Sequence, residues 1–348
     1  MNEIGKNLKR VRLLKNLSLE KAGKLLNMSA PAIAKYEKGE IVPNSQKIIE
    51  FSNAYGVKSI EFLKSYNVPQ MNFSSFRKRK RLKGKNLELL KEIIQDEVSK
   101  YLEVINMSTL RDNIKIQKYK CSNIEDAENA ANDFRNNIEI SNIQPISDLI
   151  NILENLGIVR IQIKNYNNRF DDFDGLSEIV NNIPIIVILD DIKDGARERF
   201  TIAHELGHLI LKIDDKNLDE EKLCNRFASA LLMPKKAITN EFGISRNKIS
   251  FYELKAFKNE YKVSYSAIAY RLKDLKIISE YLYKKISIFL SQNIGKNDPE
   301  PIIPEKSYQF KKIVHRLEVD NIISLNKACE LLGVSIDEYN IEDYNYRY

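Results

Sequence analysis

The chain has 348 residues, of which 43% are hydrophobic and 30% charged, a composition typical of a globular protein long enough for two or three domains. Its longest apolar run, IPIIVIL at 183–189, is too short to span a bilayer, and charges interrupt the first 14 residues, so we expect a cytoplasmic protein without a membrane anchor. Residues 1–100 contain 21 Lys and Arg against 10 Asp and Glu, whereas the remainder of the chain has a net charge of −4. The basic N-terminal part is therefore expected to contact something acidic, with nucleic acid as the first candidate.

The first 65 residues predict a small domain made only of helices. Apolar residues recur at helical spacing in 4–14, and Ser18 is a candidate cap for a second helix over 19–26. A third helix follows Ser29 and ends at Gly39, and a fourth ends at Gly56 before a last turn near 59–63.

The order of these helices resembles the lambda-repressor-like helix-turn-helix family of the Xre, or Cro/C1, type, over roughly residues 3–64. The resemblance implies that the third helix enters the major groove of double-stranded DNA. The DNA-contacting residues expected from it are Ser29, Ala30, Ala32, Lys35 and Lys38. The family often has long polar side chains on this helix, whereas this chain has Ala30-Pro31-Ala32, so direct base reading is expected to be limited to thymine methyl groups and DNA shape. The alternative is a helical module that docks another protein.

Residues 76–85, FRKRKRLKGK, contain seven basic residues in ten positions. They can bind phosphate groups or form a solvated face of a connecting segment. Two helical stretches follow within 86–135. A further helix is predicted from Pro145-Ile146-Ser147 to Gly157, and strands are predicted at 158–164 and 183–190, with RFDDFDGLS as a loop before the second strand.

The stretch RFTIAHELGHLIL, 199–211, contains two of the three histidines of the chain. In a helix, His204 and His208 lie one turn apart on one face, where both imidazoles can bind one tetrahedral cation. Glu205 lies about 100° around the helix and can reach an attacking water without being a ligand. A buried amphipathic helix with two incidental histidines is the alternative.

A third ligand is expected from the next predicted helix, NLDEEKLCNRFASALLMP, where Asn217 and Glu220 resemble a capping box that starts the helix near Leu218. We expect Glu221 to be the ligand and Asn225 to orient one of the ligands without itself binding the metal. Glu220 is the alternative ligand, one residue and about 100° away.

The sequence His-Glu-x-x-His, then twelve residues, then Glu, is similar to the gluzincin metallopeptidases. More narrowly, RERFTIAHELGHLIL with EKLCNRFASALLMP closely resembles the ImmA/IrrE family of zinc metallo-endopeptidases, although that family usually has Ala where this chain has Cys224. The resemblance covers roughly 145–280. It implies a Zn²⁺ cofactor and Glu205 as the catalytic general base. The third histidine, His315, is expected to be an ordinary surface or helix-end residue, and no residue is assigned to stabilise the oxyanion.

The expected fold is mainly α with a small sheet (α+β). The expected domains are a helix-turn-helix domain at 1–66, a basic helical connecting segment at 67–140, a zincin-like metallopeptidase domain at 141–280 and a helical C-terminal segment at 281–348.

Three functions fit this organisation. The first is a DNA-associated zinc endopeptidase that cleaves a partner transcriptional repressor, and a homodimer is compatible with it. The second is a DNA-binding regulator or antitoxin-like protein whose zinc fold is structural or sensory and does not turn over substrate. The third is an adaptor whose helix-turn-helix domain contacts another such domain.

Overall fold

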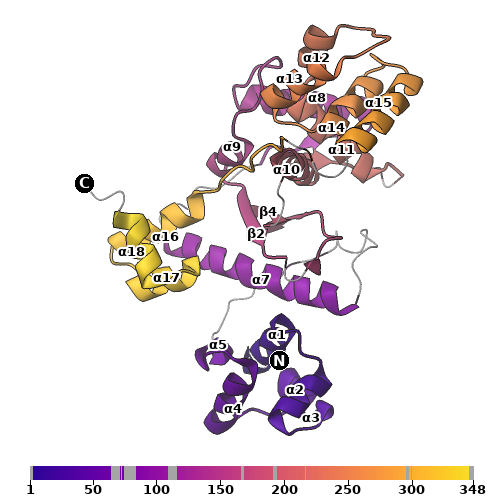
Figure 1. Ribbon diagram of the computed structural model, residues 1–348. Coiled ribbons are helices and arrows are strands. Elements are labelled where there is room, and N and C mark those ends of the chain that lie inside the picture. Colours follow the sequence, from indigo (N-terminus) through magenta and orange to yellow (C-terminus); the bar gives the residue numbers. More distant parts are fainter. Residues whose placement is uncertain are drawn as a thin grey trace. The chain divides into compact units, whose positions relative to one another are not determined.

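The computed structural model describes residues 3–63, 71, 73, 84–108, 116–165, 168–190, 194–215, 217–294, 298 and 300–344 (Figure 1). The chain divides into two compact units, the first formed by Met1–Phe73 and Arg77–Glu103 and the second by Ser74–Phe76 and Val104–Tyr348. The long helix α7 (Gly84–Met107) contributes residues to both units. As expected, the protein is mainly helical with a small sheet.

The N-terminal unit contains the five short helices that the sequence predicts. They are α1 (Glu3–Leu14), α2 (Leu19–Leu26), α3 (Ala30–Lys38), α4 (Ser45–Tyr55) and α5 (Ile60–Leu63). Ser18 and Ser29 cap α2 and α3, each accepting a hydrogen bond from the backbone N–H three residues later. Gly39 and Gly56 end α3 and α4 in the left-handed conformation, as predicted.

A compact core holds these five helices together. Phe51 is fully buried and makes edge-to-face contacts with the rings of Tyr36, Tyr55 and Phe62. Arg12 of α1 forms a bidentate ion pair with Glu37 of α3, at 2.5 and 2.9 Å, which satisfies two charges that the fold removes from water. The position of α3 against α1 is therefore fixed by charge as well as by apolar packing.

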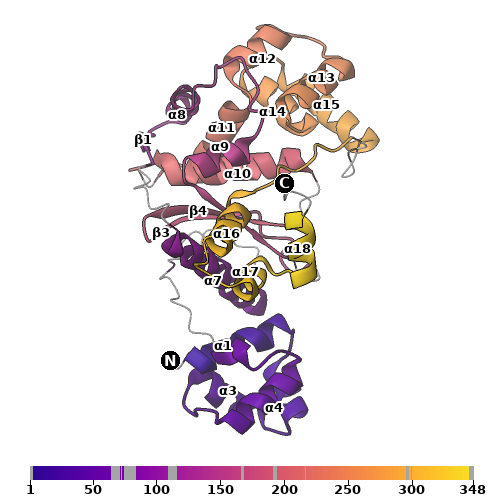
Figure 2. The same ribbon diagram turned by 90° about the vertical axis from the view of Figure 1, so that its left-hand side faces the viewer.

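Among its described residues, the C-terminal unit forms two small sheets. In the larger one, the order is β2 (Val159–Ile163), β4 (Ile183–Leu189), β3 (Leu176–Val180), with β2 parallel and β3 antiparallel to β4. The other sheet pairs β1 (Tyr119–Lys120) with β5 (Leu211–Lys212) in parallel. Helix α10 (Gly195–Ile210) lies across one face of the larger sheet and contacts β3 and β4 (Figures 1 and 2).

A further group of helices completes the main core of this unit around α10. They are α8 (Ile124–Asn137), α9 (Leu149–Asn155), α11 (Glu220–Leu232), α12 (Lys235–Phe242), α13 (Phe251–Tyr261), α14 (Tyr265–Asp274) and α15 (Glu280–Asn293). Helix α11 packs against both α8 and α10, and all three contribute fully buried side chains to one continuous cluster. The neighbouring helix α11 is therefore held close to α10 along its length.

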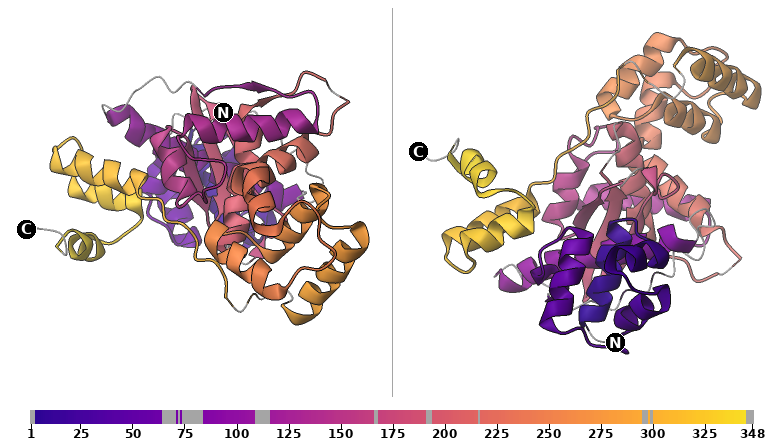
Figure 3. Two further views of the ribbon diagram at one scale, coloured as in Figure 1. Left: turned by 90° about the horizontal axis from the view of Figure 1, so that it is seen from above. Right: turned by 60° about the horizontal axis from the view of Figure 1, so that its bottom comes forward.

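The remaining helices form a separate C-terminal group, α16 (Gln309–Val319), α17 (Leu325–Leu332) and α18 (Ile336–Tyr344), visible in yellow in Figure 3. Val104, near the end of α7, is fully buried in the apolar core of this group. We call residues 300–308, which lead into α16, the strap.

The strap is bound to the start of α10. Gly195 N–H donates to the Ile302 carbonyl at 2.7 Å, and a Cβ atom at Gly195 would lie 2.6 Å from the Ile303 carbonyl oxygen, so the close approach requires glycine. The Glu305 carboxylate accepts hydrogen bonds from Arg199 and from the backbone N–H of Ile150. These contacts tie the strap to α10 and α9.

Several expected boundaries are wrong. Helix α9 begins at Leu149 with Asp148 as its cap, because the Asp148 carboxylate accepts from Asn151 N–H at 2.9 Å, and not at 145–147. The cap of α11 is Asp219 and not Asn217, since Asp219 accepts from Lys222 N–H. The end of the stretch RFDDFDGLS is not loop, because strand β3 begins at Leu176.

Candidate metal centre and DNA interface

Helix α10 presents its two histidines from an otherwise buried helix. Its first turn is capped by Asp194, which accepts from Ala196 N–H at 3.0 Å. Ile202, Leu206 and Ile210 are at most 1% exposed and anchor the helix in the core. The packing therefore fixes the rotation of α10 and brings the two histidine side chains to one side of it, one turn apart.

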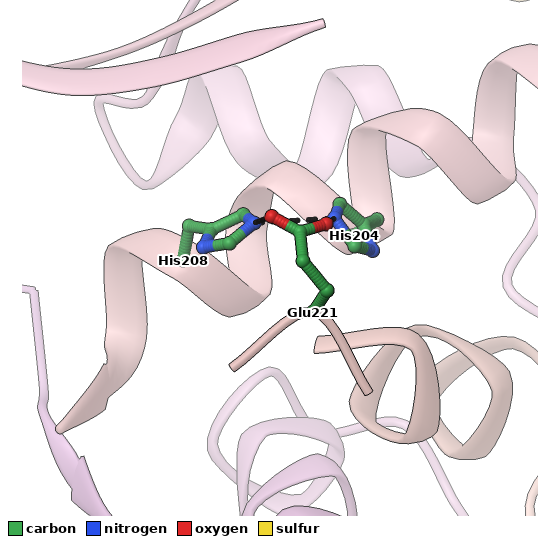
Figure 4. Close-up of side chains that lie close together, drawn as sticks. All are labelled: His204, His208 and Glu221. Atoms are coloured by element: carbon green, nitrogen blue, oxygen red, sulfur yellow. Dashed lines mark hydrogen bonds and ion pairs between the residues drawn. The ribbon is translucent and has the colours of Figure 1, made fainter. Parts of the chain in front are cut away.

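His204, His208 and Glu221 meet at one point, as Figure 4 shows. The two Nε2 atoms lie 3.1 Å apart. Glu221, from the first turn of α11, places one carboxylate oxygen 3.2 Å from His204 Nε2 and the other 3.4 Å from His208 Nε2. Ligands at about 2.0–2.1 Å on the corners of a tetrahedron are about 3.3 Å apart, so these donor atoms have the spacing and chemistry that Zn²⁺ requires.

The other ring nitrogens face two different partners. His204 Nδ1 lies 3.0 Å from Asn225 Oδ1, and His208 Nδ1 lies 2.9 Å from a Glu220 carboxylate oxygen. An acceptor at Nδ1 holds a proton there, which directs Nε2 to bind the cation. Glu220 and Glu221 are neighbours in sequence, yet they contact opposite sides of the imidazole pair.

The cluster binds a proton strongly when no other cation competes for it. Burial disfavours the charged form of His208, but hydrogen bonds to Cys224, Glu220 and Glu221 outweigh burial and raise the pKa of His208 to about 12. Hydrogen bonds from the two histidines hold the pKa of Glu221 well below its usual range. A metal cation at Nε2 would replace this proton, since only the neutral imidazole is a ligand.

Glu205 is buried against strand β3 of the sheet. Its side chain is 1% exposed, and the Ser177 hydroxyl on β3 donates to its carboxylate at 2.9 Å. Sequence reasoning did not identify Ser177. Its contact joins positions 28 residues apart, and no helical spacing or motif reveals such a pair.

The predicted DNA-contacting residues lie at the start and on the outer face of α3. Ser29 is exposed, but its hydroxyl is already used as the cap of α3 and accepts from Ala32 N–H at 3.3 Å. Lys35 and Lys38 are exposed, whereas Ala30 and Ala32 are partly exposed. Lys38 lies 3.9 Å from Glu40, and both side chains remain open to solvent. The exposed surface of α3 therefore offers two cations, Lys35 and Lys38, and two partly exposed small apolar side chains.

Two other predictions concern His315 and the basic stretch 76–85. His315 lies within α16, partly buried and stacked on Tyr339 with ring centroids 4.4 Å apart, and belongs to the C-terminal helices. Cys224 is fully buried in the core and lies beside His208, with which it forms a hydrogen bond. The basic stretch 76–85 lies almost entirely outside the described residues, with only the backbone of 84–85 described. Within the described ranges, we find no helix with the length and apolar character needed to cross a membrane.

Comparisons with known proteins agree with two parts of this picture. Residues 8–63 match the helix-turn-helix family model, and residues 154–273 match the M78 peptidase model, described as an IrrE N-terminal-like domain. No curated protein matches the chain significantly.

Two solved structures show weak similarity over nearly the whole length. A PrgX/iCF10 complex covers 96% of this chain and 95% of its own, at 14% identity and a TM-score of 0.16. The Streptococcus dysgalactiae SHP pheromone receptor Rgg2 covers 97% and 99%, at 14% identity and a TM-score of 0.15. Scores this low carry no conclusion about fold or function. The two family matches show that the chain combines a helix-turn-helix domain at residues 8–63 with an IrrE N-terminal-like domain of the M78 peptidase family at residues 154–273.

Proposed function

We propose that this protein is a DNA-associated, zinc-dependent endopeptidase that cleaves a partner transcriptional repressor and thereby relieves repression. The observation that carries the proposal is that the Nε2 atoms of His204 and His208 meet the Glu221 carboxylate. Glu205, the residue after His204 in α10, is buried. Two imidazoles and one carboxylate are the protein ligands of a catalytic zinc site, which keeps its fourth position open. A purely structural site would close that position with a fourth protein ligand.

Each residue has a separate role in this mechanism. His204, His208 and Glu221 hold the zinc ion, while Asn225 and Glu220 orient the two imidazoles through their Nδ1 atoms. When bound, zinc supplies Lewis-acid activation of water and of the scissile carbonyl. Glu205 takes the proton of the attacking water and passes it to the departing amine.

Strand β3 is the proposed docking site for the substrate backbone. In the part of the chain that the structure describes, it is one of the two outer strands of its sheet and pairs only with β4. An extended peptide can add to such an edge through main-chain hydrogen bonds. Because α10 contacts β3, a peptide bound at this edge lies near the helix that carries the histidines.

The helix-turn-helix domain is proposed to bring the protease to operator DNA, where a repressor substrate is bound. Joining the two domains in one chain raises the local concentration of protease around that substrate. Binding to chromosomal DNA also requires a cytoplasmic location, which we include in the proposal.

We also propose the domain limits expected from the sequence, which are 1–66, 67–140, 141–280 and 281–348.

The test is digestion of a purified repressor encoded beside the gene for this chain. Fragments are identified by mass spectrometry with zinc, with a chelator, and with zinc added back after the chelator. One internal cut that disappears with the chelator and returns with zinc supports the proposal. An intact repressor under all three conditions, together with salt-dependent binding of operator duplex, favours a DNA-binding regulator with a structural or sensory zinc site.

A further inference from the structure

The carboxylate of Glu205 is oriented by strand β3 and not by its own helix alone. Ser177 is the second residue of β3 and pairs in register with Ile186 of β4, so the sheet fixes its backbone. Its hydroxyl donates to one oxygen of Glu205 at 2.9 Å. With the Glu205 side chain only 1% exposed, this contact is shielded from competition by bulk water.

Gly175 confines the same side chain by its close approach. A Cβ atom at Gly175 would lie 3.0 Å from Glu205 Oε1, 3.1 Å from Glu205 Cγ and 3.1 Å from Thr201 Cγ2. These separations are shorter than ordinary van der Waals contact, so any larger residue must push Glu205 or Thr201 aside. The backbone before β3 therefore packs against Glu205 with only the room that glycine leaves.

We propose that Ser177 is a positioning residue for the general base, with Gly175 leaving the space in which the Glu205 carboxylate is held. The inference rests on the proposed function only in taking Glu205 as the base. A general base acts efficiently when its carboxylate is fixed before the substrate arrives, because misplacement by about 1 Å costs about 100-fold in rate. Ser177 supplies that fixation from the strand along which the substrate is proposed to bind.

The experiment compares five zinc-loaded proteins: the wild type, Ser177→Ala, Ser177→Thr, Gly175→Ala and the control Ser291→Ala. Ser291 is exposed on α15, so its variant removes a hydroxyl that has no part in the site. Zinc content and melting temperature are measured on each sample. Crystal structures give the Glu205 rotamer, and cleavage of fluorescein-labelled casein and of the repressor gives kcat and KM.

We expect Ser177→Ala to retain zinc and stability, to lose the single Glu205 rotamer, and to lower kcat by about 10- to 100-fold, the effect of one hydrogen bond to a charged group. Ser177→Thr keeps the hydroxyl and should restore the rotamer and most of kcat. Gly175→Ala should displace the carboxylate with the hydroxyl still present. KM should change little in all three variants, since the lost interaction acts on the base and not on substrate binding.

Two results overturn the inference. One is a Ser177→Ala structure in which the Glu205 carboxylate is unmoved and well ordered. The other is a loss in Ser177→Ala that appears in KM and not in kcat, which would make Ser177 a substrate contact. If the wild type cleaves neither substrate, the proposed function fails separately, while the Glu205 rotamers in the crystal structures still decide the positioning role.

Discussion

Replacing Glu220 or Glu221 by alanine should weaken zinc binding by clearly different amounts. Glu221 faces both Nε2 atoms, at 3.2 and 3.4 Å, so Glu221→Ala removes one of the three proposed protein ligands. Glu220 lies at the other ring nitrogen of His208, Nδ1, at 2.9 Å, so Glu220→Ala should leave the three proposed ligands in place and remove a group that orients one of them. Sequence spacing alone leaves these two residues as alternatives.

The magnitudes differ because one substitution removes a metal ligand and the other removes a hydrogen bond to a ligand. Structural zinc sites with four ligands bind with about 10–16 kcal/mol, or about 2.5–4 kcal/mol for each ligand. Glu221→Ala should therefore raise the zinc Kd by about 10² to 10³, at about 1.4 kcal/mol for each factor of ten. Loss of a group that supports a ligand typically costs about 10- to 100-fold, which is the expectation for Glu220→Ala.

The assay is competition for zinc against a chromogenic chelator at fixed pH, with Asn225→Ala as a third variant. Asn225 contacts His204 Nδ1 as Glu220 contacts His208 Nδ1, so Asn225→Ala should resemble Glu220→Ala. A Glu220→Ala protein that binds zinc as weakly as Glu221→Ala, or more weakly, would refute this expectation. That result would make Glu220 the ligand, although it lies at the Nδ1 side of His208.

Three further predictions concern stability and DNA binding. Burial raises the pKa of Glu128, but hydrogen bonds and charge from Arg271 and Arg226 outweigh it and lower the pKa. The stability that Glu128 contributes is therefore present above its unfolded pKa of about 4.3 and is lost as pH falls through its lower folded pKa. Glu128→Gln should lower the melting temperature at pH 7, and the melting temperature of this variant should fall less than that of the wild type below about pH 4.5. A melting curve of Glu128→Gln that falls as steeply in acid as the wild type would contradict this. Glu305→Ala should lower the free energy of unfolding in urea by about 3–5 kcal/mol, because it leaves the buried Arg199, 1% exposed, without its carboxylate partner. A loss below about 1 kcal/mol would contradict the role of the strap as an anchor. Replacing both lysines of α3 with alanine should weaken operator binding and reduce the slope of log K against log salt by up to about 2, whereas an unchanged slope would place the phosphate contacts elsewhere.

The helices of the N-terminal unit and the histidine pair were predictable because their causes are local. Ser18, Ser29 and Gly39 act through hydrogen bonds and backbone conformation within a few residues. The structure confirms Ser18 as a cap and Gly39 as a helix end, and it shows that Ser29 caps the helix expected to follow it. His204 and His208 share a face because of helical geometry alone.

The remaining parts depend on contacts between distant segments. Which of two adjacent glutamates turns toward Nε2 depends on the rotation of α11, which is set by packing of buried side chains such as Phe227 and Leu231 against α8 and α10. Sequence spacing favours Glu221 but leaves Glu220 as an alternative. The contacts of Glu305 with Arg199 and of Ser177 with Glu205 join residues 106 and 28 positions apart, beyond the reach of periodicity or capping rules.

The central claim is tested most directly by digesting the repressor with wild-type protein and with Glu205→Gln, with zinc content measured on the same two samples. We predict equal zinc in both and cleavage by the wild type alone, because the proposal takes Glu205 as the base and not as a ligand. Cleavage by Glu205→Gln at the wild-type rate would contradict the assignment of the base. Equal zinc with cleavage by neither protein would contradict the protease function.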